Sequence, residues 1–134
     1  MPTQYLLDTN IASFIIREDI RVIRRLTATM PSNTAISVVT EAELLFGIKR
    51  KPEAVRLNAL IHQFLSTNQI LAWTSAAAHH FAYERAVLEK KGQLLSDLDM
   101  MIAAQALAEG AVLVTNDAAF RRIERLKVED WAAL

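Results

Sequence analysis

Short apolar runs recur along this chain, and stretches with helical patterning separate them. The runs cover residues 5–7, 35–39, 70–73 and 111–115, and none contains a charged residue. Runs of this length are typical of strands buried on both faces, as in a parallel sheet. Because parallel strands need crossover connections, which are usually helical and right-handed, the pattern predicts an α/β fold. We expect a central, mainly parallel sheet with helices on both faces.

Several of the helical stretches carry start and stop signals. Thr74 or Ser75 can cap a long helix whose last turn holds Lys90 and Lys91, and Gly92 follows as a stop signal. We expect helices over residues 11–16, from residue 20, from residue 40, from Pro52, from 75 to about 90, from 97 to about 109 and over 120–123, with an edge strand at 126–128.

The composition limits the classes of protein to consider. At 134 residues and 52% hydrophobic content, the chain is expected to form a single domain over residues 1–134. It has no cysteine, which excludes disulfides, thiolate catalysis and cysteine-bound zinc. No apolar stretch approaches the ~18 residues of a membrane span, and the first residues lack signal-peptide features. We therefore expect a soluble, cytoplasmic protein with no membrane partner.

Four acids occupy similar settings, at the end of a strand or in the first turn of the helix that follows. They are Asp8, Glu43, Asp99 and Asp117. Each also has a purely structural explanation. Asp8 could cap the first helix through an Asx-type turn, and Asp117 could be first-turn charge favoured by the helix dipole.

The two middle acids fit a common helix-start motif. Thr40-x-x-Glu43 is a literal capping box, in which the glutamate reaches back to the threonine N–H. Ser96-x-x-Asp99 imitates the same box with a shorter acid. Capping boxes are common, so neither acid on its own indicates a functional site.

Taken together, the four acids indicate a metal site. A parallel sheet brings its strand ends to one edge, where converging carboxylates repel one another unless a cation lies between them. Oxygen ligands favour Mg²⁺ or Mn²⁺. Glu41 and Asp97 stand two residues from Glu43 and Asp99, about 200° around the helix, and cannot share their centre. Four neighbours could orient ligands as a supporting shell: Thr9, Asn10, Thr115 and Asn116.

Four motifs in this order and spacing resemble the PIN-domain ribonucleases, and more closely the VapC toxins of bacterial type II toxin–antitoxin pairs. The resemblance covers nearly the whole chain and ends at Leu126-x-Val128-Glu129-Asp130-Trp131. The motifs are Leu6-Leu7-Asp8-Thr9-Asn10, Ala42-Glu43-Leu44 with Gly47, Asp99-Met100-Met101-Ile102-Ala103-Ala104, and Val114-Thr115-Asn116-Asp117 with Phe120.

The resemblance implies a PIN-like three-layer sandwich and an endonuclease that cuts RNA. It implies that the four acids bind Mg²⁺ or Mn²⁺, with Asp117 varying most in position among relatives. It also implies a VapB-like antitoxin that blocks the acidic site, and a homodimer formed through the apolar helices after Asp8 and after Glu43. Members of this family cut tRNA, including initiator tRNA, or ribosomal RNA, and the sequence does not choose among these substrates.

Two other functions remain open at this stage. An aspartate-nucleophile phosphatase of the haloacid-dehalogenase type needs a second aspartate two residues after Asp8, where Asn10 stands. A receiver-type domain needs a lysine after a late strand, and Asn116-Asp117 supplies none. A catalytically inert PIN-like binding module is the remaining alternative, although it would have no reason to keep four mutually repelling acids.

RNA would have to be held by local basic patches, because fifteen basic and fifteen acidic side chains cancel. Tyr83 and Phe120 could stack on bases, although aromatic residues in helices are more often core. Any one basic cluster is also explained as a solvated helix face. The clusters are Arg17, Arg21, Arg24 and Arg25; Lys49, Arg50 and Lys51; Lys90 and Lys91; and Arg121, Arg122, Arg125 and Lys127.

Overall fold

The computed structural model describes residues 2–133. Its sheet has the strand order β3-β2-β1-β4-β5, and every neighbouring pair is parallel. The strands are β1 Tyr5–Leu7, β2 Thr34–Ser37, β3 Ile70–Leu71, β4 Val112–Val114 and β5 Val128–Glu129. The helices are α1 Thr9–Ile16, α2 Ile20–Thr27, α3 Val38–Arg50, α4 Val55–Thr67, α5 Ser75–Lys90 and α6 Asp97–Glu109, with 3-10 helices η1 Pro31–Asn33 and η2 Ala118–Arg122.

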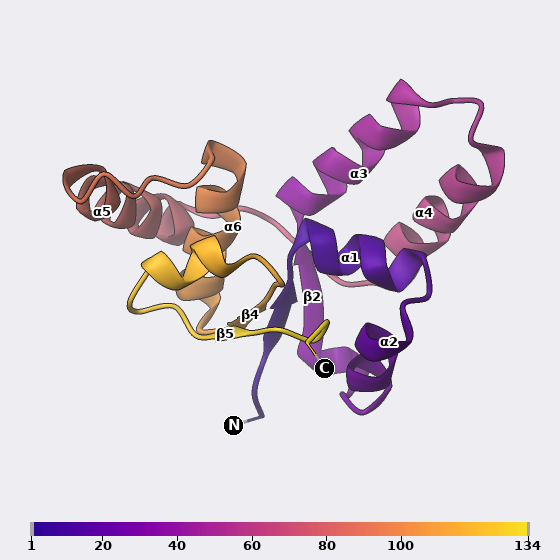
Figure 1. The fold of residues 1–134 in the computed structure, drawn as a ribbon, viewed down its shortest axis with the longest axis horizontal. Coiled ribbons are helices and arrows are strands. Elements are labelled where there is room, and N and C mark those ends of the chain that lie inside the picture. The colour runs from indigo at the N-terminus through magenta and orange to yellow at the C-terminus, as the bar shows by residue number, and fades with distance from the viewer. Residues whose placement is uncertain (1, 134) are drawn as a thin grey trace.

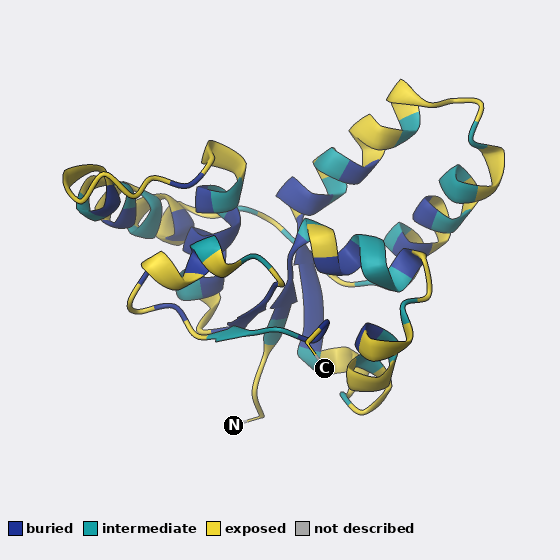
Figure 2. Cartoon of the chain, viewed as in Figure 1, coloured by how far each residue is buried: buried dark blue, intermediate teal, exposed yellow. Residues whose placement is uncertain are grey.

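Helices cover both faces of the sheet, so the structure has three layers (Figure 1). Successive strand residues point to opposite faces. Leu6 packs in one buried cluster with residues of α5, α6 and η2, whereas Leu7 packs in another with residues of α1, α2 and α4. Strands β2 and β4 are buried throughout, β1 is buried except at Tyr5, and the outer helix faces are exposed (Figure 2). The predicted three-layer α/β architecture is confirmed.

Helices α5 and α6 begin and end where the sequence predicts. The Thr74 hydroxyl accepts the N–H of Ala77 at the start of α5. Ser96 caps α6 in the same way, and Gly110 ends it in the left-handed conformation with φ of 63°. Within residues 2–133, no helix is long and apolar enough to cross a membrane.

The region around β2 and α3 differs from the prediction. Helix α3 begins at Val38, because the Ser37 side chain accepts the N–H of Val39 at 2.9 Å and caps the helix. The cap outweighs the strand preference of the two valines. Thr40 therefore lies inside the first turn, and the predicted capping box with Glu43 does not form.

The connection from α3 to α4 also differs from the prediction. Pro52 lies in the loop, and α4 begins three residues later at Val55. The residue before a proline is disfavoured in helical conformation, so the proline marks the end of α3. The N–H of Ala54 bonds to the Lys51 carbonyl at 3.1 Å, and this turn closes the loop.

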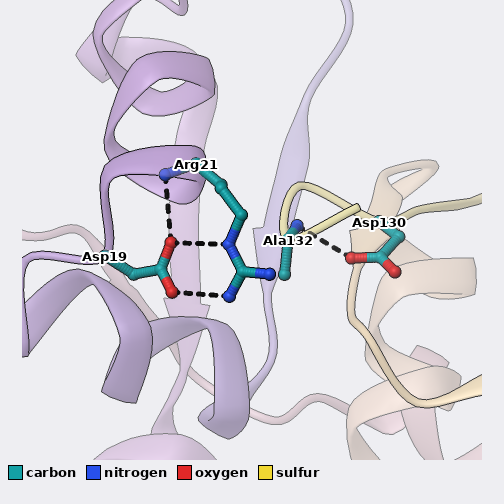
Figure 3. Close-up of polar contacts among 4 residues, drawn as sticks. All are labelled: Asp19, Arg21, Asp130 and Ala132. Atoms are coloured by element: carbon teal, nitrogen blue, oxygen red, sulfur yellow. Dashed lines mark hydrogen bonds and ion pairs between the residues drawn. The ribbon is translucent and has the colours of Figure 1, made fainter. Parts of the chain in front are cut away.

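The C-terminal segment packs against Tyr5 of β1 and against α2. Trp131 is 1% exposed and lies 5.4 Å from the ring of Tyr5. Arg25 forms an ion pair with Glu129 at 2.9 Å and lies over the Trp131 ring. At the start of the same helix, Arg21 bonds to Asp19, and its guanidinium points toward the Asp130–Ala132 turn (Figure 3). These contacts fix β5 at the sheet edge.

Candidate functional site

Asp8 lies where the central strand β1 gives way to α1. Its backbone N–H bonds to the Val114 carbonyl of β4 at 3.0 Å, so the ends of these two strands meet. Its carboxylate accepts the N–H of Ile11 at 2.8 Å and caps α1. The residue is only 4% exposed. Asp8 therefore does cap the helix, and it does so as a buried acid at the carboxyl edge of the sheet.

The environment of Asp8 disfavours its charge. Burial raises the pKa of Asp8 from 3.8 to about 6, although hydrogen bonds from Thr115 and Ile11 act in the opposite direction. The negative charges of Asp99 and Asp117 make a smaller contribution to this rise in the pKa. Three of the predicted acids therefore lie close enough to interact electrostatically.

Asp99 and Asp117, which interact electrostatically with Asp8, belong to different elements. Asp99 lies in the first turn of α6, where its N–H bonds to the Ser96 hydroxyl at 3.3 Å. Burial raises the pKa of Asp99, a hydrogen bond from Ser96 lowers it, and the charge of Asp117 raises it. Asp117 follows β4, and its carboxylate caps η2 by accepting the N–H of Ala119 at 2.9 Å.

Glu43 is tied to Thr9, the residue that follows Asp8, through a chain of hydroxyl groups. The Thr9 hydroxyl donates to Oε1 of Glu43 at 2.6 Å, and it lies 3.1 Å from the hydroxyl of buried Thr40. Since Thr9 has one hydroxyl proton, Thr40 donates to Thr9. Thr40 was not predicted as a partner of Thr9, because the sequence places it at the start of the helix. Its spacing of one helical turn from Glu43 was the available signal.

The four predicted supporting residues divide into two pairs. Thr9 contacts Glu43, and Thr115 bonds to Asp8 while accepting the N–H of Asp117 at 3.0 Å. Asn10 and Asn116 are exposed, and neither side chain forms a hydrogen bond with the residues described. The structure therefore connects the threonines to the acids and leaves the asparagines apart.

None of the four acids has a cationic side-chain partner in the described part of the chain. Residues 2–133 contain five ion pairs, and all of them involve other acids. Asp97 is one of these others, since it pairs with Arg85 of α5. This pairing agrees with the prediction that Asp97 points away from the centre shared by Asp99.

The donor set suits a hard divalent cation. It consists of carboxylate oxygens, which Mg²⁺ and Mn²⁺ prefer, and a cation would favour the ionised form of Asp8, which burial and the charges of Asp99 and Asp117 disfavour. As the side chains lie, no three acids or histidines within residues 2–133 are grouped closely enough to hold an ion. Glu43 bonds to Thr9 and is not among the charges that raise the pKa of Asp8, so Asp8, Asp99 and Asp117 are the acids that interact with one another.

The basic clusters differ in their availability. Arg21, Arg25, Lys91 and Arg125 are engaged in ion pairs with Asp19, Glu129, Glu124 and Glu84. By contrast, Arg17, Arg50 and Lys51 line a cavity that also contains Thr9 and Glu43. Of the two aromatic candidates, Phe120 is 1% exposed and belongs to the core, whereas Tyr83 is exposed beneath Arg125.

Comparison with known proteins identifies the family. The family model of the PIN domain matches residues 5–126. The chain belongs to the PIN-domain family. It is 35% identical over 130 residues to ribonuclease VapC2 of Haemophilus influenzae, which covers 96% of this chain and 98% of that protein. It is 34% identical, with the same coverage, to the tRNA(fMet)-specific endonuclease VapC of Shigella flexneri.

Solved structures of this family have the same fold. The crystal structure of DNA-bound VapBC from Salmonella typhimurium superposes with a TM-score of 0.89 at 32% identity, covering 97% of this chain and 99% of that one. The predicted PIN-like fold and the predicted likeness to VapC proteins are confirmed. The names of the relatives also bear out the predicted enzyme class, an endoribonuclease.

Proposed function

We propose that this protein is the toxin of a toxin–antitoxin pair and acts as an endoribonuclease that depends on Mg²⁺ or Mn²⁺. One observation carries the proposal. The buried carboxyl of Asp8 interacts with Asp99 and Asp117, and none of them has a cationic partner within residues 2–133. Such a cluster is costly for the fold alone, and a divalent cation would relieve it. The relatives matched end to end by this chain are ribonucleases by name.

Asp8, Glu43, Asp99 and Asp117 would hold the cation. When bound, a divalent cation lowers the pKa of water and stabilises negative charge on a phosphate undergoing in-line attack. The residues around the acids position the carboxylates that would hold the cation. Thr115 fixes the Asp8 carboxyl, Ser96 fixes the start of α6 beneath Asp99, and Thr9 aims Glu43. No histidine or lysine base is required.

The proposed substrate is RNA, with tRNA as the first candidate. One relative at 34% identity is named as specific for tRNA(fMet), the initiator tRNA. Phosphodiesters repel bare carboxylates, so both the cation and nearby arginine and lysine side chains are needed for binding. Arg17, Arg50 and Lys51 line a cavity together with Glu43 and can supply that positive charge.

The proposed partner is a VapB-like antitoxin that covers the acidic site. Two structural neighbours at 30% and 32% identity are the DNA-bound VapBC2 of Rickettsia felis and VapBC of Salmonella typhimurium, and they cover nearly all of this chain. We also propose a homodimer. Val38 and Leu45 are exposed apolar residues on α3, and they are candidates for its contact surface.

Sequencing of RNA ends after brief expression in cells tests the proposed function. The wild type is expected to produce new ends at a small number of positions, and Asp8→Ala is expected to produce none. Asp97→Asn is a matched control, because Asp97 is an acid of α6 that pairs with Arg85 outside the cluster. Unchanged RNA ends with the wild type, or cleavage that persists at full rate in Asp8→Ala, would overturn the proposal.

A further inference from the structure

A cavity of about 510 Å³ opens beside the acids. It lies among α1, α3 and α4, where the α3–α4 hairpin projects from the sheet and α1 lies at its base (Figure 1). Thr9 and Glu43 form its inner end, and Leu98, the residue before Asp99, also lines it. A molecule in this cavity would therefore lie next to the proposed cation site.

The charged side chains of the cavity, apart from Glu43, are cationic. Arg17 comes from the end of α1, whereas Arg50 and Lys51 come from the end of α3. All three are exposed, and within residues 2–133 none of them forms an ion pair. Free cations on both sides of a hollow suit a ligand with several phosphates.

An exposed aromatic ring stands in the wall of the cavity. Phe46 is 61% exposed, one helical turn beyond Glu43. The guanidinium of Arg50 lies 5.5 Å from the centre of its ring. A ring supported by an arginine is the kind of platform on which single-stranded nucleic-acid bases stack. Leu44 and Ile61 extend the apolar surface that a base face would meet.

Gly47 keeps this wall open. It lies in the interior of α3, where glycine destabilises a helix relative to alanine. Its backbone has no positive φ, and a Cβ built there would meet no atom within 4 Å. Neither backbone conformation nor packing in the fold requires the glycine. Since Gly47 lines the cavity, its missing side chain leaves room there for a ligand.

We propose that this cavity receives one unstacked base of the RNA, from a nucleotide adjacent to the bond that is cut. The base stacks on Phe46 in the space beside Gly47, and Arg17, Arg50 and Lys51 bind the flanking phosphates. The inference rests on the proposed ribonuclease function and adds a site that contributes to substrate choice. The unpaired cations Arg17 and Lys51, together with a ring supported by Arg50, favour RNA over a peptide as the occupant.

The variant Gly47→Leu tests the cavity without weakening the helix, because leucine is a better helix former than glycine. We expect a melting temperature at or above that of the wild type and unchanged Mn²⁺ binding by calorimetry. Cleavage of total cellular RNA, followed with Mn²⁺, is expected to fall about 5- to 150-fold, the range that base–aromatic stacking contributes. Ala78→Leu is the control, since it adds the same leucine side chain at a small, exposed residue of α5 outside the cavity.

The variant Phe46→Ala, combined with abasic RNA, identifies which base stacks on the Phe46 ring. The cut is mapped by sequencing RNA ends, and short oligonucleotides spanning it are made with single abasic nucleotides on either side. One abasic position is expected to slow the wild type to the rate of Phe46→Ala on the intact oligonucleotide. Phe46→Ala is expected to be insensitive to that same abasic change. Additive losses would overturn the assignment of Phe46 as the stacking platform.

The outcomes separate this inference from the proposed function. If the wild type does not cut RNA, both the ribonuclease proposal and this inference are wrong. If the wild type cuts RNA and Gly47→Leu cuts it at the same rate, only the inference fails. If Gly47→Leu cuts normally but escapes inhibition by the co-expressed antitoxin, the cavity binds a peptide, which also overturns the inference.

Discussion

The hydroxyl of Thr9 donates a hydrogen bond of 2.6 Å to Oε1 of Glu43 and so joins α1 to α3 across 34 residues of sequence. Thr9 directly follows Asp8, which caps α1. The segment Asp8–Thr9 therefore contains one of the acids, Asp8, and positions a second acid, Glu43, through the Thr9 hydroxyl. This linkage ties a glutamate in the second turn of α3 to the residue that follows the aspartate at the end of β1.

Replacing Thr9 with valine keeps the shape of the side chain and removes the donor to Glu43. We expect Thr9→Val to fold and to bind Mn²⁺ about 10- to 100-fold more weakly, the usual effect of losing a group that orients a ligand. Thr9→Ser keeps the hydroxyl and is expected to restore most of the affinity. Calorimetric titration of both variants checks the prediction. Equal affinity in the valine variant and the wild type would show that Glu43 needs no such positioning.

The stability of the metal-free protein is expected to fall as pH rises through the range from about 4 to 6. Burial raises the pKa of Asp8 from 3.8 to about 6, so the folded state binds more protons than the unfolded state in this range. The difference corresponds to a loss of about 3 kcal/mol once Asp8 is ionised. Asp8→Asn should therefore be more stable than the wild type at pH 7, and the two should converge below pH 4.

Urea denaturation in the presence of a chelator measures this pH dependence. Asn can still accept the N–H of Ile11, so the helix cap is retained in the variant. A wild-type protein whose free energy of unfolding rises between pH 4 and 6 relative to Asp8→Asn would contradict the assigned direction of the pKa shift.

Trp131→Ala is expected to destabilise the protein by about 3–5 kcal/mol, because it removes a large buried side chain. Arg25→Ala removes the exposed contacts that Arg25 makes with Glu129 and with the Trp131 ring. The exposed ion pair of Arg25 with Glu129 and its contact with the ring should contribute only about 1 kcal/mol. Urea denaturation of the two variants compares these contributions. If Arg25→Ala lowered the free energy of unfolding as much as Trp131→Ala does, burial of Trp131 would not be the main stabilising contribution.

The sequence contains enough information for the sheet and for helices α5 and α6. Uninterrupted apolar runs such as 112–114 mark strands buried on both faces, and Ser96 and Gly110 mark the ends of α6. These signals are local, and tertiary contacts do not oppose them. The position of Asp8 at a strand end follows from the same signals.

The start of α3 and the surroundings of Glu43 were harder to predict. Two β-branched valines continue the pattern of β2, and only the cap at Ser37 turns them into helix. With the start of the helix misplaced, Thr40 was interpreted as a cap and its contact with Thr9 was missed. The role of Phe120 also depended on burial, which the spacing of an isolated aromatic residue does not reveal.

Calorimetric titration with Mn²⁺ at pH 7 tests the central claim most directly, with the wild type, Asp99→Asn and Asp97→Asn compared side by side. Asp99 interacts electrostatically with Asp8 and Asp117, whereas Asp97 pairs with Arg85. The account predicts saturable binding to the wild type and to Asp97→Asn, and binding at least ~10-fold weaker to Asp99→Asn. Absence of binding to the wild type, or equal weakening in both variants, would contradict it.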